Sequence, residues 1–204
     1  TVTVNPVPTT ANAGADQNLC ALTTATLSGN TATVGTGVWT QVSGSPATIT
    51  NASLPSTTVT GLTTGTYVFR WTISNNPCTP STDDVQIRIF EQVTSPAAGP
   101  DQTLCGTVVT MAGNVPTVGT GTWTRVSGPN TPVITNASSA TTTITGLVTG
   151  TYVFRWTITN GPCTAFDEVT IIITTGPTPA NAGPDQNLCA ATTATLSGNT
   201  ASQG

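Results

Sequence analysis

The sequence predicts an all-β chain built from tandem seven-stranded β-sandwiches in a linear array. Short runs of Thr, Val and Ile are separated by turns that draw on 20 glycines and 15 prolines. Such residues favour strands and turns, and no useful stretch has the apolar spacing of a helix. The phrase GTYVFRWTISNNPC at 65–78 returns as GTYVFRWTITNGPC at 150–163. The chain therefore repeats one β-rich module.

A second phrase sets the length of the module, because the cysteines that end its copies are 85 and 84 residues apart. The copies are AGADQNLC at 13–20, AGPDQTLC at 98–105 and AGPDQNLC at 182–189. Residue 1 opens in the alternating phrase TVTVNP, so we expect an internal piece of a longer protein. The expected parts are a last strand with a Pro-rich joint (1–10), two complete repeats (11–94 and 95–178) and the start of another (179–204).

Seven short strands are predicted in the first complete repeat. They are expected at 16–20, 25–29, 38–43, 47–51, 57–62, 66–74 and 84–90. Alternate residues of the sixth strand should face the core, and Tyr67 at its start suits the tyrosine corner of an immunoglobulin-like sandwich. The aromatic residues expected in the two cores are Trp39, Tyr67, Phe69, Trp71, Trp123, Tyr152, Phe154 and Trp156.

In fixed order, the phrases AGPDQ, WTQVSG, TTVTGLTTGTYVFRWTIS and STDDVQIRI resemble the polycystic-kidney-disease (PKD) domain, an immunoglobulin-like module. The resemblance covers both complete repeats, although the DFGDG segment of many PKD domains is absent. The cysteine-bearing, Thr-rich variants in giant surface proteins of gliding Bacteroidetes are more similar still. Those proteins resemble adhesins exported by type 9 secretion. The resemblance implies an extracellular or cell-surface stalk, in the setting of gliding motility, with no catalytic residue.

Two pairings of the cysteines are open. Bonds within repeats would join Cys20 to Cys78 and Cys105 to Cys163, whereas a bond between repeats would join Cys20 to Cys163. The first strand of such a sandwich runs parallel to the last, so it ends about 20 Å from the end of the sixth. A disulfide needs Cα atoms within about 7 Å, which favours bonds between repeats. On either pairing Cys189 would be unpaired within this chain, and the bonds would indicate an oxidising, extracellular setting.

Calcium is the only cofactor that the carboxylates suggest, and we otherwise expect none. Carboxylate oxygens suit calcium, but each cluster is small, and an Asp that bonds nearby backbone is the alternative. The candidates beside the predicted joints are Asp16, Asp101 and Asp185, and those that open the last strands are Asp83, Asp84, Asp167 and Glu168.

Composition excludes several functions. The net charge is −4, with four Arg and neither Lys nor His, so we expect no nucleic-acid partner. No apolar run is long enough for membrane insertion. Without His there is no His-assisted nucleophile, and adjacent acids on a strand point to opposite faces, so we expect no enzyme. The sequons at Asn51 and Asn136 are expected to be ordinary turns.

The function expected is a structural stalk, spacer or filament shaft. Its expected partners are the neighbouring repeats of the same chain and other copies of itself in a filament. The alternative is a glycan- or protein-binding adhesion module. Glycan binding would need solvent-facing aromatic residues, and only Phe90 and Phe166 lie off the predicted inward positions. The side chains of Arg70 and Arg155 are predicted to lie on the outward faces of their strands, where each can pair with an acidic side chain of a neighbouring strand.

Overall fold

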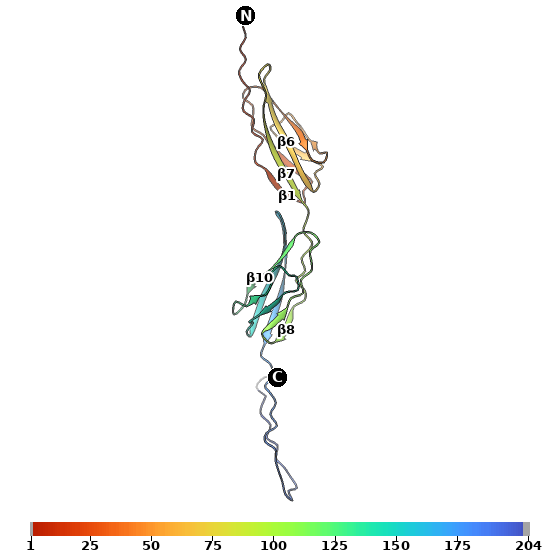
Figure 1. Ribbon diagram of the computed structural model, residues 1–204, viewed down its shortest axis with the longest axis vertical. Helices are drawn as coiled ribbons and strands as arrows, with labels where there is room; N and C mark the ends of the chain where they lie inside the picture. The colour runs from red at the N-terminus through yellow and green to blue at the C-terminus, as the bar shows by residue number, and fades with distance from the viewer. Residues whose placement is uncertain (1, 202–204) are drawn as a thin grey trace. The chain divides into compact units, whose positions relative to one another are not determined.

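The computed structural model describes residues 2–201, in which every regular element is a β-strand (Figure 1). The predicted all-β class and the tandem sandwiches are therefore confirmed. The strands of the first repeat form two sheets, in the orders β1-β7-β6-β3 and β2-β5-β4. They are β1 (Gln17–Cys20), β2 (Thr24–Ser28), β3 (Thr36–Ser43), β4 (Thr48–Ile49), β5 (Ser56–Thr60), β6 (Gly65–Ser74) and β7 (Ser81–Phe90).

The second repeat has the same strand order. Its sheets run β10-β13-β14-β8 and β11-β12-β9. The strands are β8 (Gln102–Cys105), β9 (Val108–Thr110), β10 (Thr120–Ser127), β11 (Val133–Ile134), β12 (Thr143–Thr145), β13 (Gly150–Asn160) and β14 (Cys163–Thr174). In both repeats the first strand pairs in parallel with the seventh, as expected from the sequence.

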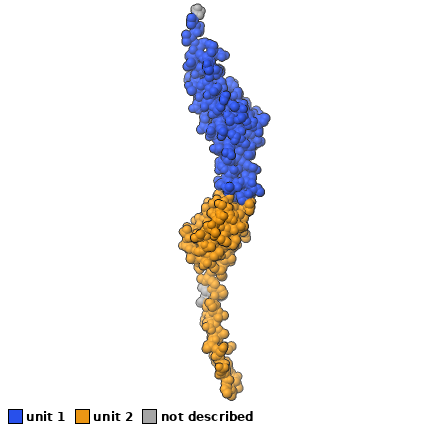
Figure 2. Space-filling view, viewed as in Figure 1, with its two compact units in different colours: residues 1–95, 116–120, 158–165 blue, residues 96–115, 121–157, 166–204 orange. Residues whose placement is uncertain are grey.

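The chain divides into two compact units (Figure 2). Unit 1 contains the residues up to 95 together with 116–120 and 158–165. Unit 2 contains 96–115, 121–157 and the residues from 166 onward. The units therefore differ from the sequence repeats, because two short segments of the second repeat pack as part of unit 1.

Each repeat is built around a pair of tryptophans. The eight aromatic residues predicted for the cores are all at most 1% exposed. Trp39 and Trp71 have ring centroids 5.0 Å apart, and Trp123 and Trp156 have theirs 5.1 Å apart. The indole N–H of Trp71 donates to the carbonyl of Asn30 at 3.1 Å. Burial of such large rings, with their N–H groups bonded, supplies much of the stability of a small sandwich.

Glycine in the repeated GTG phrase makes room for these rings. A Cβ at Gly37 would lie 2.0 Å from Trp71 Cζ2, and one at Gly121 would lie 2.1 Å from Trp156 Cζ2. Gly37 lies inside β3, where glycine otherwise weakens a strand. The phrase therefore marks a close approach of a ring to the backbone, in addition to the turn at Gly35.

The predicted tyrosine corner is present. The hydroxyl of Tyr67 accepts from the backbone N–H of Thr63 at 2.8 Å and donates to the Thr63 carbonyl at 3.1 Å. Tyr152 repeats the first contact, accepting from the N–H of Val148 at 2.9 Å. These bonds satisfy a hydroxyl that is otherwise buried.

Some predicted strand limits were wrong. β7 begins at Ser81 rather than at residue 84, because its ladder with β6 extends to the pair Ile73 and Ser81. The acid pairs therefore lie within the last strands instead of opening them. β4 is limited to Thr48–Ile49, shorter than the predicted 47–51.

The described residues at the two ends, 2–16 and 175–201, carry no assigned strand. Residues 2–4 were predicted as a strand with Thr1, which lies outside the described residues, and they are exposed coil. A strand is defined by a ladder with a neighbour, and no ladder is assigned to these residues. Residues 175–201 are likewise without a strand.

Candidate functional site: a disulfide-linked joint

A disulfide joins Cys20 to Cys163, with their Cα atoms 5.0 Å apart. Cys20 ends β1 of the first repeat and Cys163 begins β14 of the second, and both belong to unit 1. The alternative pairs Cys20–Cys78 and Cys105–Cys163 are therefore not formed. Cys78, Cys105 and Cys189 are free.

The strand order explains this pairing. β1 is parallel to β7, with Cys20 opposite Phe90, and β6 is antiparallel to β7. β1 consequently ends at the opposite end of the sandwich from the end of β6, where Cys78 follows. Cys20 is out of reach of Cys78 and lies where the chain leaves the first repeat.

The backbone that leaves β7 is held by side chains around the disulfide. Asn160 Nδ2 donates to the carbonyl of Glu91 at 2.8 Å, and Cys163 Sγ lies 3.9 Å from the carbonyl of Phe90. All of these residues belong to unit 1. We call this set, together with Cys20, Thr94, Thr117 and Val118, the joint.

A threonine completes the joint. Thr94 N donates to the carbonyl of Val118 at 3.1 Å, and Thr94 Oγ1 accepts from the N–H groups of Thr117 and Val118 at 2.9 and 2.8 Å. Thr9 makes the same three contacts with Thr33 and Val34, at 3.1, 2.9 and 2.9 Å. A short connection that reads as a Pro-rich spacer is therefore fixed by hydrogen bonds.

Sequence reasoning did not identify these threonines as functional. The signal that could have found them is the recurrence of Thr at positions 9 and 94, each at the same place in the module. In a chain this rich in Thr, that recurrence is weak evidence by itself.

The surroundings of Cys78 repeat those of Cys163. Asn75 Nδ2 donates to the carbonyl of Pro6 at 2.7 Å, and Cys78 Sγ lies 3.6 and 3.4 Å from the carbonyls of Asn5 and Pro6. Cys78 thus faces the backbone of Asn5 and Pro6 in the way that Cys163 faces that of Phe90.

Cys105 repeats the position of Cys20. It ends β8 opposite Thr174, and its Sγ lies 3.1 Å from Thr174 Oγ1. Cys105 and Cys189 are both exposed.

Four of the candidate calcium carboxylates accept hydrogen bonds from backbone N–H groups. Asp16 and Asp101 accept from the N–H groups of Gln86 and Thr170 at 2.8 and 2.7 Å. Asp83 and Asp167 accept from Ala13 and Ala98 at 2.7 and 2.8 Å. These bonds tie the beginning of each repeat to its last strand. Within residues 2–201, no group of three or more His, Cys, Asp or Glu side chains is gathered as a metal site would need.

The remaining acids of the last strands pair with arginine. Arg70 and Asp84 lie opposite each other, with Nε 2.7 Å from Oδ1, and Arg155 Nη2 lies 2.6 Å from Glu168 Oε1. The hydrogen bonds from Arg70 lower the pKa of Asp84 below its ordinary value. Both pairs are solvent-facing, so each contributes little to stability. Asp185 is exposed.

We predict that calcium leaves the melting temperature unchanged, because six of the seven candidate carboxylates already bond backbone N–H groups or arginine. A ligand that binds only the folded state raises that temperature. Thermal unfolding with calcium, compared with magnesium and with a chelator, measures the effect. A saturable rise specific to calcium would contradict the prediction.

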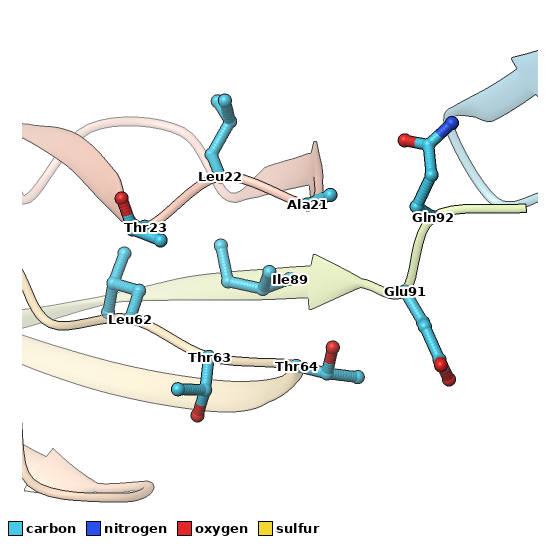
Figure 3. Close-up of a pocket in the computed structure, with 9 residues that line it drawn as sticks. All are labelled: Ala21, Leu22, Thr23, Leu62, Thr63, Thr64, Ile89, Glu91 and Gln92. Carbon is cyan, nitrogen blue, oxygen red and sulfur yellow. The ribbon is translucent and has the colours of Figure 1, made fainter.

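A shallow pocket of about 340 Å³ lies in unit 1, beside the end of β7 (Figure 3). Its lining residues are Ala21, Leu22, Thr23, Leu62, Thr63, Thr64, Ile89, Glu91 and Gln92. No lining residue is aromatic, so the pocket has no ring on which a sugar could stack. Of the two phenylalanines outside the predicted cores, Phe90 and Phe166, the more exposed is Phe166. Its side chain is 56% exposed, and Arg155 Cζ lies 4.0 Å from its ring centre.

The sequon asparagines form local turns. Asn51 Oδ1 accepts from the N–H of Ser53, and Asn136 Oδ1 accepts from that of Ser138, both at 3.0 Å. This is the geometry of an Asx turn.

Comparison with known proteins places the repeats in a family. The model of the K319L-like, PKD domain matches residues 13–89 and again 98–173. Among curated proteins there is no match. No helix within the described range is long and apolar enough to cross a membrane.

Solved structures with similar folds include chains of immunoglobulin domains. Drosophila OTK, extracellular domains 3–5, is 15% identical with a TM-score of 0.58, and the match covers 79% of this chain and 60% of that one. Sidekick-1 immunoglobulin domains 1–5 are 14% identical at 0.54, covering 84% and 40%. Murine CEACAM1b is 14% identical at 0.51, covering 78% and 95%. The first two structures extend well beyond the part that this chain matches. At these identities the likeness shows the fold.

Proposed function

The chain belongs to the K319L-like PKD domain family, and from this premise we propose that it is a load-bearing stalk or spacer segment of an extracellular surface protein. Tandem immunoglobulin-like and PKD domains are structural or adhesion-type modules. Such domains are typically non-catalytic, and disulfides are typical of secreted proteins. The finer role, a spacer in a large secreted adhesin or filament, rests on the resemblance to gliding Bacteroidetes proteins and type 9 export.

The observation that supports load bearing is the long span of the disulfide. Cys20 and Cys163 are 143 residues apart in sequence, and this interval includes most of both sandwiches. Tension applied to the two ends of the chain would pass through the sulfur–sulfur bond. The intervening residues would then carry little of it, so the sandwiches would resist being pulled apart.

We propose that Cys78 and Cys105 take part in bonds of the same kind with further repeats. Their surroundings match those of Cys163 and Cys20 respectively. Each bond would form when two thiols lose two protons and two electrons to a disulfide oxidant, which is reduced to a dithiol. A series of such bonds would link neighbouring repeats covalently. Association with other copies in a filament is a further part of the proposal.

Single-molecule force spectroscopy on the full chain tests the proposal. With the disulfide intact, the 143-residue interval cannot extend. Reduction should add about 500 Å of contour length, at roughly 3.6 Å per residue. The Cys20→Ser/Cys163→Ser variant should show the longer extension with or without reductant. Equal extension of the oxidised and reduced wild-type protein would reject the proposal.

The alternative, a glycan- or protein-binding adhesion module, receives less support because the aromatic residues are largely in the cores. A clear glycan-array signal from the intact chain, lost in Phe166→Ala, would favour it over the spacer.

A further inference from the structure

We propose that two residues at the joint form a matched pair that decides which repeats can be joined. One ends the last strand of a repeat, and the other lies in the turn after the sixth strand of the next, which we call the tip (75–78 and 160–163). The pair at the bonded joint is Phe90 with Gly161. The corresponding residues beside Cys78 are Asn5 and Asn76. The inference rests on the proposed spacer function and adds a rule for the order of the repeats.

The space beside Gly161 is occupied by the Phe90 ring. A Cβ at Gly161 would lie 2.3 Å from Cε1 and 2.4 Å from Cδ1 of Phe90. At that separation something must move, and the ring is not free to do so without cost. Arg88 Cζ lies 4.4 Å from its centre, and the Phe90 backbone is in the ladder opposite Cys20. A repeat that ends in phenylalanine therefore fits a tip that has glycine.

The first repeat shows the opposite combination. Its tip holds the corresponding coil segment in the same way, since Asn75 bonds the Pro6 carbonyl as Asn160 bonds that of Glu91. Here the residue that corresponds to Phe90 is Asn5, which lies in coil and is smaller than phenylalanine, and the tip residue, Asn76, has a side chain.

The two tips also differ in backbone conformation. Gly161 has φ of +60°, a left-handed angle that Asn76 does not adopt. Gly161 accompanies the large Phe90, and the larger Asn76 accompanies the smaller Asn5. Because the chain holds both combinations, each tip is suited to its own partner residue.

Formation of the disulfide reports this fit. Cys20 and Cys163 flank Phe90, and a disulfide needs its Cα atoms within about 7 Å. A pair that does not fit would hold the tip away from the strand end and lower the equilibrium constant for the bond. Oxidised glutathione serves as the oxidant, and each bond formed converts one glutathione disulfide to two thiols.

The test is a double-mutant cycle in a chain carrying Cys78→Ser, Cys105→Ser and Cys189→Ser, so that only the joint cysteines remain. The four proteins carry Phe90/Gly161, Phe90→Asn, Gly161→Asn or both changes. Gly161→Asn turns the tip into NNPC, the sequence already folded at 75–78. Each protein is equilibrated with reduced and oxidised glutathione, and the Cys20–Cys163 peptide is quantified by mass spectrometry.

We expect Gly161→Asn alone to lower the equilibrium constant at least about tenfold, as overpacking does. Adding Phe90→Asn should restore it to within about threefold of the starting protein, because the two residues are coupled. If the double variant is no better than the product of the single effects, the matched pair is rejected.

Two further outcomes are distinguishable. A Gly161→Asn protein that unfolds by circular dichroism, and is refolded by Phe90→Asn, supports the coupling, whereas failure of both to fold rejects it. Absence of the bond in the starting protein would instead reject the proposed function.

Discussion

Replacing Cys20 and Cys163 together with serine is expected to lower the free energy of unfolding by about 4 kcal/mol. The bond closes a 143-residue separation, so its removal enlarges the conformational freedom of the unfolded chain. The loss should also separate unfolding into more than one transition, since the covalent tie between the repeats is gone. Urea unfolding followed by tryptophan fluorescence, together with calorimetry, measures both effects.

Matched controls come from the free cysteines. Cys105→Ser and Cys189→Ser change exposed thiols that are in no disulfide, and each should leave the unfolding curve unchanged. Reductant should destabilise the wild-type protein but have no effect on Cys20→Ser/Cys163→Ser. An oxidised wild-type protein as easily unfolded as that variant would show that the bond does not stabilise the fold.

The sandwich was predictable because the core residues of the first repeat recur at the equivalent positions of the second. Alternation along β6 put Tyr67, Phe69 and Trp71 on one face, and the same alternation returns in β13. The expected parallel course of the first and last strands is present in both repeats. Together these were enough to favour a bond between repeats over one within them.

The details of the joint were less accessible from the sequence. Thr94 acts through a hydroxyl that bonds two backbone N–H groups, and apart from its recurrence at position 9 nothing in the sequence distinguishes it from the many threonines on strand faces. Phe90 and Gly161 are far apart in sequence, and their contact depends on the path taken by the tip. Such contacts come from tertiary geometry, which local patterns do not encode.

For the acidic residues, the sequence suggested a site where the structure shows local hydrogen bonds. Oxygen-rich residues beside a joint suggested calcium, but Asp16 and Asp83 cross between the first segment and the last strand to accept backbone N–H groups. The sequence shows the same Asp residue whether its carboxylate binds calcium or accepts a hydrogen bond from the backbone. Only the position of a neighbouring N–H group in the folded chain distinguishes these two roles.

Gly37→Ala is expected to destabilise the first repeat by about 3 kcal/mol, a typical upper value for overpacking. The new Cβ would lie 2.0 Å from Trp71 Cζ2 and 2.4 Å from Cη2. The ring cannot simply retreat, because its N–H is bonded to Asn30 and it packs against the ring of Trp39. Chemical unfolding and near-ultraviolet circular dichroism of the tryptophan pair measure the change.

Matched glycine-to-alanine variants separate the effect of packing from that of backbone strain. Gly37 and Gly176 both lack a left-handed φ, and a Cβ at Gly176 meets nothing within 4 Å. Gly176→Ala should therefore be neutral, while Gly121→Ala should reproduce the defect in the second repeat, where the Cβ would lie 2.1 Å from Trp156. Trp71→Leu costs stability by leaving a cavity, but it should make Gly37→Ala nearly harmless in the same chain. If Gly37→Ala costs as much with leucine at 71 as with tryptophan, the close approach of ring and strand is not what requires glycine there.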